Sequence, residues 1–380
     1  MPWISDPLPP EVLAGEVDHL PQNAFSVVGY WQRLRPHLRR FGISRVADIT
    51  GLDRIGFPVV QVLRPGARSN VVTQGKAMTL EGAAVGAVLE CLEMAAGEDL
   101  ARFSTTPEGN PATWAPLAPG LPEGTVWPDA NTDYIAAYDI TNDATVSLPR
   151  DLISTDFARG ADAESAPILR HSIGLGAGAS LGAAMMHGLM EAIEADARLR
   201  AEASGREHRL ALDRDDTDYG PLLDLLAAAG IEAMVYAQPC KAGLFAIKAS
   251  VFERQGAISL PLPANGYAAR PKQSAAITAA LAEAIQARLA VISGAREDIT
   301  QRFYAHGFRP ADLEAEWQRQ TRLATIQTDP RVSTPTVRQL AAQVGPVFAV
   351  PLHWDPDLPL AITRIIAPSL ITDPFRLDVP

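Results

Sequence analysis

The chain has 380 residues, of which 47% are apolar and 20% are charged, and its 44 acidic side chains outnumber 33 basic ones. This composition provides a large buried core and excludes wholesale disorder. The net charge of −11 argues against general nucleic-acid binding, which requires an excess of lysine and arginine. An acidic excess is ordinarily a solvated surface, but part of it can be buried where it holds metal ions.

Cysteine content and the apolar pattern indicate the surroundings in which the chain works. Cys91 and Cys240 are the only cysteines, which excludes a disulfide framework or a cysteine-based zinc site and indicates a reduced, cytoplasmic environment. Residues 1–20 lack the basic start and apolar stretch of a signal peptide. The sequence has no run of about 20 uncharged apolar residues, so we expect neither a membrane partner nor a nucleic-acid partner.

The predicted elements mix helices and strands without the regular alternation of a parallel α/β fold. Residues 1–40 are expected to be an N-terminal leader segment, followed by strands around residues 46–47 and 57–63. Strong helices are predicted over residues 79–96, 180–203 and 274–293, with a further helix over 220–229. Short strands and loops are expected over 104–165, with strands over 233–236, 243–251, 347–350 and 361–366. The predicted fold class is α+β (mixed α/β), and neither a Rossmann fold nor a TIM barrel.

Each strong helix carries a carboxylate that is followed three residues later by a second carboxylate or an amide. An offset of 101 residues superimposes the first pair on the second, and a further 92 residues superimposes the second pair on the third. The pairs are Glu90 and Glu93, Glu191 and Glu194, and Glu283 and Gln286. Because residues i and i+3 lie on one face of a helix, each pair can coordinate one cation from one side.

The surroundings of these carboxylates favour a metal site. The three helices are apolar nearly all the way round, a pattern typical of buried helices. A buried carboxylate is destabilising unless it is paired or bound to a metal. Lys76 and Arg288 are too few to neutralise five glutamates, whereas divalent cations can. Ligation by oxygen alone favours Mg²⁺, which usually binds substrate phosphates as well, and this favours a nucleotide site.

Several residues of this region have more than one interpretation. A single glutamate pair can be an ordinary solvated pair, and His187, one turn before Glu191, fits either a core residue or a ligand. Cys91 fits a packing role. The classical phosphate-binding loop is missing, but the glycine-rich residues 174–178 precede a helix, so their backbone N–H groups could face an anion.

In these motifs the sequence resembles the YcaO family. The resemblance runs from about Arg45 to Ile366 and rests on residues 47–59, on residues 74–76 and on the three helices. The third helix and its extension, residues 282–298, look like the subgroup that works with TfuA-type partner proteins.

The resemblance implies a fold and a chemistry. The expected fold is YcaO-type with nested subdomains, a core over residues 41–310, and residues 311–380 as the C-terminal part of the same domain. ATP is expected to bind through Mg²⁺ between the helices, outside any classical nucleotide fold. The expected reaction is phosphorylation of a peptide amide oxygen followed by attack of a nucleophile. External sulfide would give a thioamide, and a Cys, Ser or Thr side chain would give an azoline.

Site residues and partners are implied in the same way. The family's metal positions fall on Glu90, Glu93, Glu191, Glu194 and Glu283. Its nucleotide positions fall on Lys76, Ser172, Glu283, Gln286 and Arg288. No residue is assigned as the catalytic group. The implied partners are a substrate peptide or protein and a TfuA-like protein, and a homodimer is left open.

The sequence also departs from the family's motifs. Neutral residues replace polar or basic ones at Gly86, Met94, Ile173 and Ala195, and Ala77 replaces the last glycine of a Gly-Lys-Gly motif. These losses leave open an altered nucleotide site, a site completed by a partner, and a degenerate scaffold that binds peptide without chemistry. A Mg²⁺-dependent enzyme acting on other phosphates is also open. Azoline-forming members often end in a proline-rich tail, whereas this chain ends in the single Pro380, which disfavours an azoline product.

Overall fold

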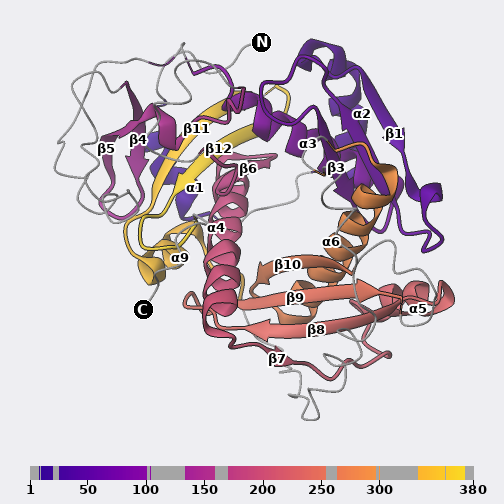
Figure 1. Cartoon of the computed structure of the whole chain (residues 1–380). Coiled ribbons are helices and arrows are strands. Elements are labelled where there is room, and N and C mark those ends of the chain that lie inside the picture. Colours follow the sequence, from indigo (N-terminus) through magenta and orange to yellow (C-terminus); the bar gives the residue numbers. More distant parts are fainter. Residues whose placement is uncertain are drawn as a thin grey trace.

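The computed structural model describes residues 8, 10–19, 25–100, 103, 133–158, 170–253, 263–296, 299, 333–355 and 357–372. Within these residues the protein is a mixed helix and sheet structure built on separate antiparallel sheets (Figure 1). The fold class predicted from the sequence is confirmed.

The helices are α1 (Pro10–Val17), α2 (Val27–Leu34), α3 (Leu80–Ala96), α4 (Leu181–Ser204), α5 (Gly220–Ala228), α6 (Gln273–Ser293) and α9 (Val337–Val344), with 3₁₀ turns η1 (Arg35–Phe41), η2 (Thr50–Leu52) and η5 (Arg150–Leu152). The strands are β1 (Arg45–Asp48), β2 (Val59–Leu63), β3 (Val72–Lys76), β4 (Tyr134–Asp139), β5 (Ala144–Pro149), β6 (Leu175–Gly178), β7 (His208–Arg209), β8 (Glu232–Gln238), β9 (Phe245–Phe252), β10 (Ala264–Arg270), β11 (Phe348–Asp355) and β12 (Leu360–Ile366).

Within the described residues the strands form three sheets, with the orders β1-β2-β3, β10-β9-β8-β7 and β5-β4-β11-β12-β6. In each sheet one edge strand leads directly into a glutamate-bearing helix, which packs back on that strand: β3 into α3, β6 into α4, and β10 into α6. Thr79 caps α3 and Ser180 caps α4, each by accepting a hydrogen bond from a backbone N–H of the first turn. The strong helices therefore begin where the sequence predicts.

Each helix also packs on the edge strand of another unit. Helix α3 contacts β6, α4 contacts β10, and α6 contacts β3, so that the three strand–helix units close into a ring. Figure 1 shows α4 on one side of this ring, in the middle of the view, with α3 and α6 on the side toward β1. The ring brings together three helices that lie far apart in the sequence.

Glycines allow the backbone of each edge strand to contact the backbone of its helix directly. A Cβ atom on Gly75 would lie 2.1 Å from the backbone N of Ala87, and one on Gly176 would lie 2.1 Å from the carbonyl O of Ala184. The third strand is similar, because a Cβ on Gly266 would lie 2.3 Å from the O of Ala280. Only a residue without a side chain allows the backbone of each strand to touch its helix.

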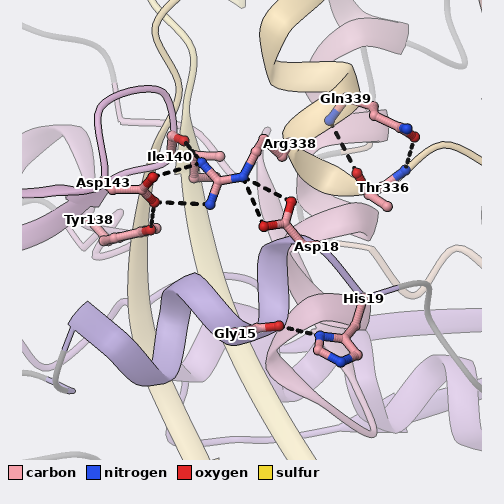
Figure 2. Close-up of polar contacts among 9 residues, drawn as sticks. All are labelled: Gly15, Asp18, His19, Tyr138, Ile140, Asp143, Thr336, Arg338 and Gln339. Carbon is pink, nitrogen blue, oxygen red and sulfur yellow. Dashed lines mark hydrogen bonds and ion pairs between the residues drawn. The ribbon is translucent and has the colours of Figure 1, made fainter.

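The expected leader segment contains helices that pack on the ring. Helix α1 packs against α4, and α2 packs against α3. Figure 2 shows how Arg338 of α9 ties α1 to the β4–β5 turn. Its Nε lies 2.8 Å from Asp18, its Nη2 donates to Asp143 at 2.9 Å, and its Nη1 donates to the carbonyl of Ile140 at 2.9 Å.

By length and composition alone, α6 could cross a membrane, and it is the one described helix of which this is true. It packs against β9 and β10, however, and 61% of its most apolar stretch is buried. A core helix gives the same signal.

Candidate functional site

A cavity of about 520 Å³ opens where the three helices meet. Its walls come from α3, α4 and α6 and from their edge strands β3, β6 and β10. All five predicted glutamates line it, together with Lys76, Ser172 and Gln286: Glu90 and Glu93 from α3, Glu191 and Glu194 from α4, and Glu283 from α6. The helices on which the sequence predicts a shared site therefore do surround one cavity.

Arg288 lies elsewhere. It does not line the cavity and is only 2% exposed. Its Nε donates to Asp53 at 2.7 Å, and its Nη2 donates to Glu253 at 2.8 Å. These contacts place the guanidinium between η2 and the end of β9, outside the cavity wall.

Backbone N–H groups orient three of the glutamates. The N–H of Ala177 donates to Glu93 at 2.6 Å, and the N–H of Gly174 donates to Glu191 at 3.0 Å. Glu283 accepts from the N–H of Tyr267 at 3.3 Å. Two N–H groups of the glycine-rich segment 174–178 thus do face anions, and these anions are the protein's own carboxylates.

The remaining contacts connect α6 to β3. Lys76 Nζ lies 3.3 Å from Glu283, and the side-chain amide of Gln286 donates to the carbonyl of Gln74 at 2.9 Å. Two residues predicted to bind nucleotide are therefore held in place by the contact that closes the ring.

Burial shifts the protonation of the carboxylates. It raises the pKa of Glu191 to about 8, and the negative charge of Glu93 adds to the effect. Burial likewise raises the pKa of Glu90 to about 7 and that of Glu194 to about 7, the latter with a further contribution from Glu283. Three carboxylates therefore lack sufficient positive charge from the protein around them.

His187 faces the same cavity. Its Nδ1 lies 3.5 Å from Glu93, and its side chain is 49% exposed. Burial opposes its protonation, but the hydrogen bond with Glu93 and the charges of Glu93 and Glu191 outweigh burial, so that its pKa is raised. Of the two interpretations of His187, the structure places it at the site rather than in the core.

The donor set suits Mg²⁺. Five carboxylates face the cavity against the cations Lys76, Arg270 and Arg296, and the shifted pKa values show that positive charge is lacking there. In the part of the chain that the structure describes, no three acidic, histidine or cysteine side chains gather into a preformed metal cage. Mg²⁺ typically uses one or two carboxylates with waters and phosphate oxygens, so an open set of carboxylates fits it.

The third helix differs in register from the other two. The strand glycines contact Ala83 of α3, Ala184 of α4 and Ala280 of α6, and these three alanines are 101 and 96 residues apart. The structure therefore aligns α4 with α6 at an offset of 96 residues, whereas the glutamate pairs align them at an offset of 92. Glu283 is thus one helical turn nearer the start of its helix and matches His187 in position. The places that correspond to Glu191 and Glu194 are occupied on α6 by Ala287 and Ala290, which also line the cavity.

Several site residues were not predicted. Asn70, Tyr267, Arg270 and Arg296 also line the cavity. One signal was available for Tyr267, because it follows the contact glycine Gly266 as Lys76 follows Gly75. Such a repeat of glycine before a helix could have identified both positions.

The departures from the family motifs occupy different environments. Gly86 and Met94 line the cavity, so these losses change its wall. Ile173 packs against the apolar core, and Ala195 is 4% exposed and does not line the cavity. Residues 297–298 of the last motif and the terminal Pro380 lie outside the described residues.

Comparison with known proteins identifies the family of the chain. The family model described as YcaO cyclodehydratase, ATP- and Mg²⁺-binding, matches residues 74–370, most of the chain. The chain belongs to the YcaO family. The matched span begins in β3 and includes all three glutamate-bearing helices of the YcaO fold.

Relatives and solved structures extend the match. An uncharacterized protein from the tfuA 3′ region of Rhizobium leguminosarum bv. trifolii is 28% identical over 96% of this chain and 93% of its own length. YcaO from Methanopyrus kandleri bound with AMPPCP and Mg²⁺ has a TM-score of 0.72 and 20% identity, covering 92% of both chains. A chain of the Escherichia coli microcin synthetase McbBCD complex with pro-MccB17 bound has a TM-score of 0.65 and 15% identity, covering 86% and 88%. The two structures show a shared YcaO fold.

Proposed function

We propose that this protein uses ATP and Mg²⁺ to activate a backbone amide of a peptide or protein and converts it to a thioamide. The observation that carries the proposal is the convergence of five glutamates and three cations, from three helices, their strands and the segment after α6, on one cavity of a YcaO-family chain. A cavity of this charge is suited to a polyphosphate with its cation.

The chemistry follows from the poor electrophilicity of an amide. The amide oxygen attacks the terminal phosphorus of ATP, which releases ADP and leaves phosphate on that oxygen. Hydrosulfide then adds to the carbon, and loss of phosphate leaves sulfur in place of oxygen. Phosphorylation is required because it converts the oxygen into a leaving group.

The residues of the cavity divide this work. Lys76, Arg270 and Arg296 supply positive charge to phosphate oxygens, while the glutamates would hold Mg²⁺. When bound, Mg²⁺ offsets the negative charge of the phosphates during transfer. The backbone contacts of Glu93 and Glu191 keep these carboxylates oriented before ligand arrives, which lowers the cost of binding.

A thioamide is favoured over an azoline by the partner that the sequence indicates. Residues 282–298 resemble the TfuA-associated subgroup, and a relative of this chain is encoded beside tfuA. We therefore propose a TfuA-like protein as the source or carrier of sulfide, acting in the cytoplasm.

The proposal is tested by purifying a candidate substrate peptide after co-expression with this chain and a TfuA-like protein. Mass spectrometry is expected to find exchange of oxygen for sulfur. Loss of water would instead identify an azoline, and an unchanged peptide with no ATP binding by calorimetry would support a scaffold.

Glu191→Gln tests the site itself. The substitution removes a carboxylate of the cavity and is expected to lower peptide-dependent phosphate release by at least about 100-fold, because a metal ligand is lost. Glu202→Gln on the same helix is the matched control, since Glu202 is exposed and lies outside the cavity. Normal turnover in a folded Glu191→Gln protein would contradict the metal assignment.

A further inference from the structure

A second hollow lies away from the cavity, between η1 and the outer edge of the sheet β1-β2-β3. Its volume is about 460 Å³. We name it the arginine groove, and its lining consists of Trp31, Arg35, Pro36, Leu38, Arg39, Ile43, Ser44, Arg45 and Val46. Figure 1 shows β1 at the outer edge of the molecule, on the far side of its sheet from β3.

The charge of the groove is opposite to that of the chain. Residues 19–47 contain no aspartate or glutamate, although the chain has 44 acidic side chains. Arg35, Arg39 and Arg45 line the groove, are exposed, and make no ion pair with any residue that the structure describes. Three cations thus converge on one hollow without a carboxylate of their own.

The floor of the groove is apolar. Trp31, Leu38 and Val46 are partly exposed and pack on the core below them, and Ile43 is buried among them. An occupant can therefore place apolar side chains against the floor and carboxylates against the rim, which is the pattern of an alternating strand.

The edge of β1 offers hydrogen bonds to such a strand. β1 pairs only with β2 within the described residues, and an antiparallel ladder uses the N–H and C=O groups of alternate residues. The remaining groups of β1 face outward beside the groove, where an extended chain can pair with them.

We propose that the arginine groove binds an acidic, extended segment of a peptide, which adds as a strand to β1. Resting on the proposed function, this segment is the recognition part of the substrate, held apart from the amide that reacts. A strand added to β1 lies three strand spacings, about 14 Å, from β3, whose Lys76 lines the cavity. Recognition at the groove would raise the local concentration of the amide at the cavity.

Binding is tested without ATP or Mg²⁺, so that the result does not depend on turnover. The probe is a fluorescent peptide that alternates glutamate with valine and threonine and is long enough to cover the four residues of β1. We expect saturable binding that weakens as salt is added. A peptide with lysine in place of glutamate is expected not to bind, and failure of the acidic peptide to bind would overturn the proposal.

Variants identify the surface. Substitution of Arg35, Arg39 and Arg45 together by glutamine is expected to weaken binding at least about tenfold, because three charge contacts are lost. Arg206→Gln is the control, since Arg206 is also exposed but lies outside the groove. Unchanged binding by the triple variant would overturn the proposal.

Two further probes test the mode and the class of ligand. The same peptide with N-methyl groups on alternate amides is expected to bind more weakly, because strand pairing loses its donors. Equal affinity would exclude strand addition. A single-stranded RNA that competes as well as the peptide would also overturn the proposal, in favour of a phosphate-binding surface.

The two proposals fail separately. Glu191→Gln is expected to bind the acidic peptide as the unmodified protein does, because the groove lies outside the cavity. Peptide binding without any thioamide product would sustain the groove and contradict the proposed reaction. If a thioamide forms and the KM for the substrate peptide is the same in the triple arginine variant, the proposed reaction is supported and the role of the groove is contradicted.

Discussion

At the scale of single residues, the site depends on carboxylates that the protein only partly compensates. Glu191, Glu90 and Glu194 each have a pKa raised by burial, while Glu93 and Glu283 accept backbone hydrogen bonds. A site prepared in this way binds cations because the ligand-free state is electrostatically unfavourable.

This state predicts a dependence of stability on pH. The pKa of Glu191 is about 8 in the folded chain against an ordinary 4.5, so its contribution to stability is complete below 4.5 and is lost as pH rises through about 8. Without ligand, the chain should therefore gain stability relative to Glu191→Gln as pH falls across this window. Thermal melts of both proteins at matched pH values measure the difference, and a constant difference would contradict the shifted pKa.

Arg288 predicts a different phenotype from the glutamates. Because Arg288→Met leaves Asp53 buried and unpaired, it should lower the free energy of unfolding by about 3–5 kcal/mol. Urea denaturation measures this loss. The double variant Arg288→Met/Asp53→Leu should regain most of it, since both charges are removed, and a stable single variant with weakened ATP binding would restore the nucleotide role.

Side-chain direction explains why Arg288, which the family resemblance implies as a nucleotide contact, does not line the cavity. Glu283 and Gln286 are three residues apart and share a face, whereas Arg288 lies five residues after Glu283, about 140° round the helix. The same helical geometry that identified the glutamate pairs therefore places Arg288 on another face, toward Asp53. The helical face agrees with the position of Arg288 outside the cavity, whereas its role toward the nucleotide rests on the family motif alone.

At the scale of elements, the sequence predicts the helices better than the strands beside them. The long helices are marked by length, apolar content and capping residues. Strands β3, β6 and β10 were not predicted, since each contains glycine, which has low strand propensity. They form because the glycine lets each strand dock against its helix, and that contact is invisible in a local pattern.

The docking glycine supplies a test. Gly176→Ala puts a methyl group 2.1 Å from the carbonyl of Ala184, so β6 and α4 must separate, at a cost of about 2 kcal/mol or more. The melting temperature and ATP affinity should both fall, because β6 carries Gly176 beside Ala177, the donor to Glu93. Gly66→Ala is the control, with nothing within 4 Å of the new Cβ. Equal stability of the two variants would mean that the contact is not tight.

At the scale of the whole molecule, contacts between residues far apart in the sequence join the ring to the elements that surround it. Arg338 joins α9 to α1 and to the β4–β5 turn, outside the cavity (Figure 2). Hydrogen bonds with Asp143 and Asp18 raise the pKa of Arg338, so it stays charged. The sequence alone gave no sign of this link, because its members lie up to 320 residues apart.

Arg338→Ala should loosen α1 without affecting the site. Amide hydrogens of Pro10–Val17 are expected to exchange several times faster, since α1 loses its tie through Asp18. Hydrogen-exchange mass spectrometry measures the change, and ATP binding serves as the internal control. Arg338→Lys should rescue little, because lysine cannot reach three acceptors in one plane. Unaltered exchange in α1 would show that packing on α4 alone holds it.

The closure of the ring also constrains the order in which the protein can assemble. The contacts of β3 with α6 join residues 207 and 212 positions apart, so they carry a large cost in chain entropy and depend on a helix made late in synthesis. During translation, α3 and α4 carry four of the five glutamates and are made before α6, which forms the third wall of the cavity. Within the described residues, however, β6 pairs only with β12, so the sheet that carries α4 also waits for Leu360–Ile366 to be made. A chain interrupted between α6 and β12 would thus carry all five glutamates and still lack a complete ring, which makes β12 the element that completes the site.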